Sequence, residues 1–228
     1  PRRRLARGRI YCDRAFGATT DRTFSPYNAA VHSGDTIVPK PRPSFRLMRP
    51  VVLVGLMGCG KTTVGARLAA MLNAPFRDAD AEIVKAAGRS IPDIFESLGE
   101  EAFRDGEKRV ISRLLETGPM VLATGGGAFA AAETREKVKE AGVAVWLRAD
   151  LDTLVERTGR KNNRPLLRAG DPRTILQGLM DQRYPLYAEA EITVDSTPKG
   201  TAEDVAYAII DGIKAHDATS DKPLLSTA

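Results

Sequence analysis

Residues 55–62 read Gly-Leu-Met-Gly-Cys-Gly-Lys-Thr, the G-x-x-x-x-G-K-[ST] pattern of a phosphate-binding loop. A strand-like apolar segment precedes the loop and a helical pattern follows it, which is the context the pattern requires. Glycines let backbone N–H groups turn toward a phosphate, and a helix N-terminus adds the positive end of its dipole. A glycine-rich turn that binds nothing is the alternative, but the complete pattern favours a nucleoside triphosphate site. The predicted nucleotide contacts in the loop are Gly58, Cys59, Gly60, Lys61, Thr62 and Thr63.

Two carboxylates, Asp78 and Asp80, lie at the end of the next strand-like segment. In an extended chain, residues i and i+2 point to the same side, so both side chains could face a cleft above the strand ends. One carboxylate near Mg²⁺, beside the Thr62 hydroxyl, and one that orients an acceptor hydroxyl is an arrangement that kinases use. Alternatively, Asp80 is the N-cap of a helix over residues 81–85. These residues alone leave both interpretations open.

Three consecutive glycines, residues 125–127, follow a third strand-like segment. Such a run costs backbone entropy and needs a reason. A functional reason is close approach of a ligand to bare backbone with exposed N–H donors. The alternative is a flexible turn.

Arg104 and Glu107 are spaced i, i+3 in a helical pattern, so they share a face and can pair. A surface ion pair is the simpler interpretation, and the spacing alone favours it. The other interpretation is an arginine fixed by Glu107 and directed at an anionic substrate, since a guanidinium binds a carboxylate in a bidentate manner.

The basic segment 157–172 interrupts an otherwise regular pattern of strands and helices. Long irregular insertions in compact domains are usually functional lids or disordered loops. Next to a triphosphate site, we expect a lid that closes its arginines over the phosphates and excludes water. Arg183 lies further on in a helical pattern, where a solvated helix face is the alternative to a binding role.

Strand-like and helical segments alternate between residues 51 and 214, which predicts an α/β fold with a parallel sheet covered on both faces. The predicted strands are 51–54, 75–78, 120–123, 143–147 and 191–194. The predicted helices are 62–72, 91–116, 134–140, 151–158, 172–190 and 202–214.

The charge of the 228-residue chain is divided unevenly. Residues 1–50 hold 11 of the 34 Lys and Arg but 3 of the 29 Asp and Glu, so their net charge is +8, against −3 for residues 51–228. The basic balance therefore gives no evidence that the folded part binds nucleic acid or an anionic membrane. We expect a disordered, Pro-rich leader over 1–48, a kinase domain over 49–215 with its lid at about 157–172, and a flexible tail over 216–228. The leader is interpreted as a dispensable extension or an over-called start, with a transit peptide as the alternative.

Rare residue types exclude several classes of site. With two cysteines and two histidines, the chain cannot build a disulfide framework or a Cys-rich zinc site, and a histidine base would have to come from a tail. This usage suits a reducing compartment, so a cytoplasmic protein is expected. No apolar run approaches the roughly 20 residues of a membrane helix.

In order and spacing, these motifs resemble the shikimate kinase family. They are the loop 55–62, Asp78-x-Asp80, Phe103-Arg104…Glu107, the glycines 125–127, Arg164-Pro-Leu-Leu and Arg183-x-Pro-Leu-Tyr187. The likeness covers about residues 49–214, and the leader has no counterpart in it. It implies a nucleoside-monophosphate-kinase-like P-loop fold of three α/β/α layers, with a five-stranded parallel sheet, a helical substrate-binding region and a lid.

The resemblance also implies an activity and a set of roles. The γ-phosphoryl group of ATP would pass to the 3-hydroxyl of shikimate, with Mg²⁺ as cofactor, in a monomer of aromatic amino-acid biosynthesis. Lys61, Asp80 and Arg164 would be catalytic, and Thr62 and Asp78 would support the metal. Arg164 would also contact ATP phosphates, and Arg157 would lie near the adenine. The acceptor would contact Asp80, Arg104, Gly126, Gly127 and Arg183.

Two departures and two alternatives accompany this interpretation. Cys59 stands where a smaller polar residue is common, and no adenine contact is predicted over 196–200 because the preceding segment looks one residue short. The alternatives are another small-metabolite kinase, such as one resembling gluconate kinases, and a nucleotide-dependent regulatory module.

Overall fold

The computed structural model describes residues 45–159 and 170–227. The predicted leader up to residue 44, and residues 160–169 of the predicted lid with Arg164, lie outside this range.

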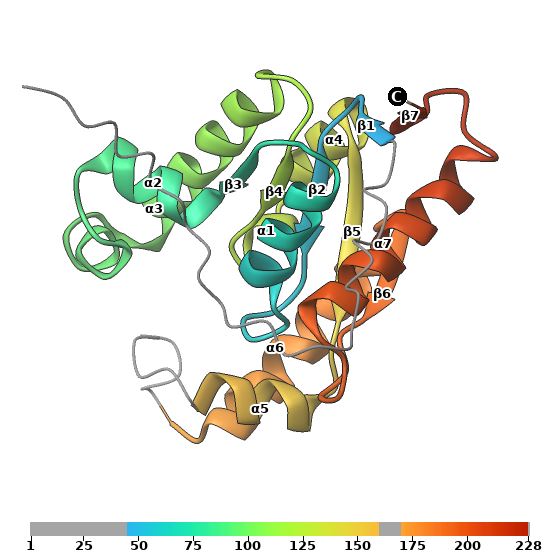
Figure 1. Cartoon of the computed structure of the whole chain (residues 1–228). Helices are drawn as coiled ribbons and strands as arrows, with labels where there is room; N and C mark the ends of the chain where they lie inside the picture. The colour runs from blue at the N-terminus through green and yellow to red at the C-terminus, as the bar shows by residue number, and fades with distance from the viewer. Residues whose placement is uncertain (1–44, 160–169, 228) are drawn as a thin grey trace, which may run out of the picture. The chain divides into compact units, whose positions relative to one another are not determined.

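Five parallel strands form the central sheet, in the order β3-β4-β2-β5-β6 (Figure 1). The middle strand, β2, is buried along its whole length, because helices cover both faces of a parallel sheet of this kind. Its neighbours are β4 on one side and β5 on the other, so the loop after β2 opens where the strand order changes direction, a common place for ligands. The strands are β2 (Val51–Val54), β3 (Phe76–Asp78), β4 (Val121–Ala123), β5 (Val143–Arg148) and β6 (Ile192–Asp195).

Helices fill the connections between these strands and form the outer layers. In Figure 1, α1 lies in front of the sheet and α4 behind it, and α1 packs against α7 while α3 packs against α4. The predicted three-layer α/β/α fold is confirmed. The helices are α1 (Lys61–Met71), α2 (Ala79–Ala87), α3 (Ile91–Leu115), α4 (Ala132–Ala141), α5 (Leu151–Gly159), α6 (Pro172–Tyr187) and α7 (Ala202–Asp217), with a short 3-10 helix, η1 (Ala128–Ala130).

Both ends of the described chain differ from the prediction. A second, two-stranded sheet pairs β1 (Phe45–Leu47) with β7 (Leu225–Thr227) in antiparallel fashion. The carboxylate of Asp217, at the end of α7, accepts hydrogen bonds from the N–H groups of Leu224 (2.8 Å) and Leu225 (2.9 Å), and Leu224 is fully buried. The expected flexible tail is therefore ordered up to residue 227, and β1 begins inside the segment expected to be disordered. A strand of three residues is too short to show a periodic pattern of apolar residues. Because β1 and β7 are also far apart in the sequence, no local pattern predicts that they pair.

The helix α3 bends at Gly99, whose φ of 83° is outside the helical range. The first part of α3 and the preceding α2 form the helical region predicted to bind substrate. None of the described helices is long and apolar enough to cross a membrane.

Candidate active site

Glycines shape the phosphate loop that links β2 to α1. Gly55 and Gly60 have φ values of 136° and 99°, which residues with side chains rarely adopt. At Gly55 a Cβ atom would also lie 2.7 Å from the carbonyl oxygen of Leu147. The loop therefore requires glycine at both ends of the motif.

Lys61 begins α1 with its ammonium group buried against this loop. Its Nζ donates hydrogen bonds to the carbonyl oxygens of Gly55 (2.7 Å) and Leu56 (2.9 Å). It also lies 3.6 Å from Sγ of Cys59, whose thiol belongs to the core and whose N–H donates to Leu56. The ammonium is thus held inside the loop that would surround a phosphate. Cys59 faces the core, and its contact with the nucleotide stays a prediction.

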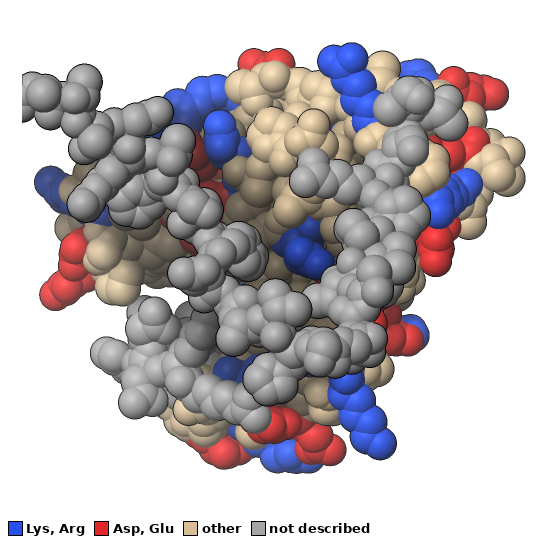
Figure 2. Space-filling view, viewed as in Figure 1, with Lys and Arg blue, Asp and Glu red and all other residues tan. Residues whose placement is uncertain are grey.

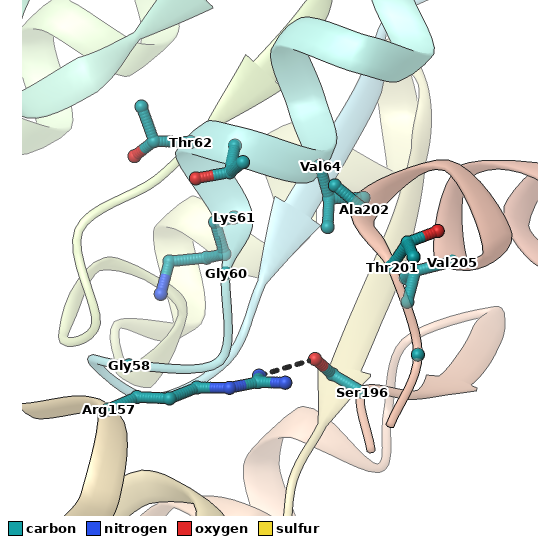
Figure 3. Close-up of a pocket in the computed structure, with 12 residues that line it drawn as sticks. Gly58, Gly60, Lys61, Thr62, Val64, Arg157, Ser196, Thr201, Ala202 and Val205 are labelled. Atoms are coloured by element: carbon teal, nitrogen blue, oxygen red, sulfur yellow. Dashed lines mark hydrogen bonds between the residues drawn. The ribbon is translucent and has the colours of Figure 1, made fainter. Parts of the chain in front are cut away.

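A cavity of about 360 Å³ lies between this loop, the start of α1 and the segment after β6 (Figure 3). Arg157 of α5 crosses it: Nη1 donates to Oγ of Ser196 (2.8 Å) and Nη2 to the carbonyl of Thr197 (2.7 Å). Five predicted loop residues line this nucleotide cavity, namely Gly58, Gly60, Lys61, Thr62 and Thr63.

The opposite wall of the nucleotide cavity contains residues that the sequence analysis missed. Ser196, Gly200 and Thr201 line it. The available signal was their position directly after the last parallel strand, where α/β folds place ligand contacts.

Asp78 connects the phosphate loop to α2. Its Oδ2 accepts a hydrogen bond from the Thr62 hydroxyl (2.8 Å), and its Oδ1 accepts from the N–H groups of Asp80 (3.1 Å) and Ala81 (3.3 Å). Asp78, and not Asp80, is therefore the N-cap of α2. Asp80 lies in the first turn of that helix, so helix geometry, and not an extended chain, sets its direction.

The Thr62 hydroxyl and the Asp78 carboxylate are hard oxygen donors, the ligand type that Mg²⁺ prefers. Within the part of the chain that the structure describes, no group of three or more His, Cys, Asp or Glu side chains could hold a metal ion. Mg²⁺ at phosphoryl-transfer sites typically takes one or two protein ligands together with substrate phosphates. The donor set present fits that mode of binding.

A second cavity, of about 440 Å³, lies between α2, α3, α6 and the loop after β4. Its polar side brings together residues predicted from four separate motifs, and its apolar side includes Ile91, Phe95 and Phe103. The polar lining residues are Asp80, Arg104, Glu107, Gly125, Gly126, Gly127 and Arg183. Two arginines and two carboxylates in one cavity fit a small acceptor with an acidic group and hydroxyls, so we refer to this cavity as the acceptor cavity.

Arg104 and Glu107 form a partly buried ion pair rather than a surface one. Nη1 of Arg104 lies 2.7 Å from Oε2 of Glu107, whose side chain is only 2% exposed. Burial raises the pKa of the Glu107 carboxyl, and Arg104 acts against this increase. Both residues line the second cavity, which does not fit an ordinary surface ion pair, and the binding of an anionic substrate by Arg104 stays a prediction.

Two of the three glycines at 125–127, Gly125 and Gly127, leave room for neighbouring side chains. A Cβ atom at Gly125 would lie 2.6 Å from Oε1 of Glu107, and one at Gly127 would lie 2.6 Å from Nη1 of Arg104. None of the three has a positive φ. Close approach of side chains thus explains Gly125 and Gly127, whereas a Cβ atom at Gly126 would meet nothing nearer than 3.4 Å.

Arg183 is partly buried on α6 and not on a solvated face. Its Nη1 donates to the carbonyl of Gly126 (3.0 Å), and the Tyr187 hydroxyl donates to the same oxygen. The Arg183-x-Pro-Leu-Tyr187 motif contains Tyr187 but does not by itself indicate a role for it.

Comparison with known proteins identifies close relatives. The family model described as shikimate kinase matches residues 57–214. Shikimate kinase from Brucella canis is 54% identical over 166 residues, which is 73% of this chain and 82% of that protein. Shikimate kinase from Caulobacter vibrioides is 59% identical over 148 residues, 65% of this chain and 74% of that protein. The solved structure of shikimate kinase from Acinetobacter baumannii, in complex with shikimate, has a TM-score of 0.71 at 42% identity and covers 74% of this chain and 94% of that one.

Proposed function

The chain belongs to the shikimate kinase family, and on this premise we propose how its own residues bind the two substrates and transfer the phosphoryl group. It is an ATP-dependent kinase that phosphorylates the 3-hydroxyl of shikimate, giving shikimate 3-phosphate and ADP, in the pathway to chorismate and the aromatic amino acids. One observation carries the assignment of roles. Two consecutive residues of the phosphate loop face different cavities: Gly58 lines the nucleotide cavity and Met57 the acceptor cavity. The loop therefore separates donor from acceptor, and the γ-phosphate would lie at this boundary.

On the nucleotide side, Lys61 binds the β- and γ-phosphates. Its ammonium donates hydrogen bonds to two loop carbonyls in this structure, and phosphate oxygens of ATP would replace these carbonyls as acceptors. Arg157 lies at the adenine end, which its hydrogen bonds across the cavity support. Arg164 contacts the transferring phosphate. It lies outside the described residues, so its role is supported by the Arg164-Pro-Leu-Leu motif alone.

Thr62 and Asp78 would hold Mg²⁺, which their hydrogen-bonded oxygens support. When bound, the ion would neutralise the negative charge of the phosphates and orient them.

On the acceptor side, Arg104 and Arg183 bind the carboxylate of shikimate, and the backbone of Gly126 and Gly127 contributes further contacts. Asp80 accepts a hydrogen bond from the reacting hydroxyl. The apolar wall around Phe95 and Phe103 receives the carbon ring.

In the chemical step, the hydroxyl oxygen bonds to the γ-phosphorus while the bond from phosphorus to the bridging oxygen of ADP breaks. The hydroxyl proton passes to the Asp80 carboxylate or to water. The transition state of such transfers is loose, so positioning and charge neutralisation contribute more than basicity. A carboxylate is a weak base, so orientation of the hydroxyl is the larger role of Asp80.

We also propose that the enzyme is a cytoplasmic monomer that binds neither nucleic acid nor membrane. The monomeric state rests on the family resemblance alone, and two observations support the rest of this proposal. The net charge of residues 51–228 is −3, and basic and acidic side chains are interspersed on the visible described part of the face in Figure 2. Cys59, the described cysteine, is unpaired and buried, as suits a reducing compartment.

ADP release by the purified chain with Mg-ATP, measured with shikimate, with gluconate and without an acceptor, tests the assignment. Release that depends on shikimate is expected. Release with gluconate alone would keep the kinase class but reassign the acceptor cavity. No release with either acceptor, alongside normal ATP binding, would favour the regulatory alternative.

A further inference from the structure

The carbonyl oxygen of Gly126 accepts two hydrogen bonds from α6, one from Nη1 of Arg183 (3.0 Å) and one from the Tyr187 hydroxyl. A carbonyl oxygen has two lone pairs, so its capacity is filled. Gly126 has no side chain to restrict its backbone, and glycine is the most conformationally free residue. These two donors therefore supply the restraint that the residue itself lacks.

The direction of this carbonyl also determines the direction of the next N–H group. In a planar trans peptide, the C=O of Gly126 and the N–H of Gly127 point in opposite directions. Because the carbonyl faces α6, the N–H of Gly127 faces away from α6. Across residues 45–159 and 170–227, no carbonyl or side chain accepts a hydrogen bond from that N–H. Gly127 lines the acceptor cavity, so a ligand oxygen there is its available partner.

Burial and ring packing restrain the side chain of Tyr187. It is 1% exposed, and its ring packs near Phe129 of η1 with 6.5 Å between centroids. Phe129 follows the glycines closely in sequence, so the ring and the hydroxyl restrain the same segment. Burial raises the pKa of the Tyr187 hydroxyl, which therefore remains a neutral donor at physiological pH.

The two donors to Gly126 are not equivalent once substrate binds. The guanidinium of Arg183 lines the acceptor cavity and is also required by the carboxylate, so its bond to Gly126 competes with the substrate. The Tyr187 hydroxyl is not required by the carboxylate, so its hydrogen bond to Gly126 does not compete with the substrate. It is the donor that keeps the peptide in place in the complex.

We propose that Tyr187 is a positioning residue for the acceptor: its hydroxyl fixes the peptide between Gly126 and Gly127 so that the N–H of Gly127 meets a carboxylate oxygen of shikimate. This inference rests on the proposed function of the cavity.

The test compares Tyr187→Phe with Tyr184→Phe in the full chain. Tyr184 lies on the same helix and also donates its hydroxyl to a backbone carbonyl, that of Ala149, which is not part of the glycine segment. Loss of one buried hydrogen bond should raise the KM for shikimate in Tyr187→Phe about five- to tenfold, with kcat changed less than about threefold. The dissociation constant of ADP, measured by calorimetry, should stay within about twofold, and Tyr184→Phe should keep the wild-type KM. An unchanged KM in Tyr187→Phe would overturn the proposal.

A second measurement needs no variant. In wild-type protein labelled with ¹⁵N-glycine, saturating shikimate should shift the Gly127 amide resonance downfield, and an unmoved resonance would overturn the proposal even if Tyr187→Phe fails to fold.

Failure of the proposed function and failure of the role of Tyr187 give different results. Wild-type protein without shikimate-dependent ADP release would refute the proposed function, whereas normal wild-type turnover with an unmoved KM in the variant would refute only the role of Tyr187.

Discussion

Nη1 of Arg104 lies 2.7 Å from Oε2 of Glu107, while Oε1 of the same carboxylate is buried with no hydrogen-bond partner among the described residues. A buried carboxylate is costly unless it is paired and hydrogen-bonded, and this one is paired through a single oxygen. The other oxygen faces Gly125, where the missing Cβ atom makes room for it. Glu107 thus fixes Arg104 at the expense of an incompletely satisfied carboxylate.

This arrangement predicts a pH dependence of stability that Glu107→Gln removes. Burial raises the pKa of the Glu107 carboxyl above its ordinary value of 4.5. The folded state therefore retains a proton that the unfolded state loses, and the contribution of this group to the free energy of unfolding falls as pH rises from about 4.5 through the raised pKa. Glutamine cannot titrate, so the variant lacks this decline. Urea denaturation between pH 4.5 and 7.5 should show that the free energy of unfolding of the variant, minus that of wild type, increases with pH.

A difference that stays constant over this range would contradict the raised pKa. Glu100→Gln is the matched control, because Glu100 also pairs with Arg104 but is 63% exposed.

Substitutions of the two aspartates of the Asp78-x-Asp80 motif should have different effects on turnover and on stability. Asp80→Asn should lower kcat at least about tenfold, because a neutral amide cannot take the hydroxyl proton and its oxygen is a weaker acceptor than a carboxylate, while the dissociation constant of ADP stays near wild type. Asp78→Ala should lower the free energy of unfolding by about 1 kcal/mol through loss of the N-cap of α2 and should raise the Mg²⁺ concentration needed for half-maximal rate. Steady-state kinetics with a Mg²⁺ titration, together with urea denaturation, measure both. Wild-type kcat in Asp80→Asn would return that residue to a structural role.

The outcome for these aspartates illustrates what sequence patterns could and could not predict. The phosphate loop and the five strands were accessible, because a long local motif and runs of apolar residues depend on neighbours in the chain. Which aspartate caps α2 depended on where β3 ends, and boundaries are the least certain part of such predictions.

Other features depended on contacts between distant segments. Spacing could place Arg104 and Glu107 on one face of α3, but their burial comes from packing against the loop after β4. The pairing of β1 with β7 and the donation from Tyr187 to Gly126 have no local signal.

Gly127→Ala should weaken acceptor binding. The added Cβ atom would lie 2.6 Å from Nη1 of Arg104, so either the guanidinium or the backbone must move. Because a displaced arginine no longer matches the carboxylate, the KM for shikimate should rise more than about tenfold, with ADP binding unchanged.

The control for this variant is Gly178→Ala in α6, where a Cβ atom would meet nothing within 4 Å. It should keep the wild-type KM and stabilise the fold by up to about 1 kcal/mol, because alanine is the better helix former. Equal KM values in the two variants would contradict the explanation of the glycine run by close approach.

The small sheet of β1 and β7 predicts where the N-terminal segment stops being dispensable. Neither strand lines the nucleotide or the acceptor cavity, so this sheet should affect the stability of the fold and not the turnover. A chain starting at residue 45 keeps β1 and should retain kcat and the free energy of unfolding within about 1 kcal/mol. A chain starting at residue 49 loses the buried Leu47 and the hydrogen bond from the N–H of Met48 to the carbonyl of Leu224 (2.7 Å). Its free energy of unfolding should fall by about 2–5 kcal/mol, as for other losses of a buried leucine, with kcat unchanged below its melting temperature.

Urea denaturation of both truncated chains, each with an added initiator methionine, measures this difference in stability. Equal stabilities would mean that the pairing of β1 with β7 contributes nothing to the folded state.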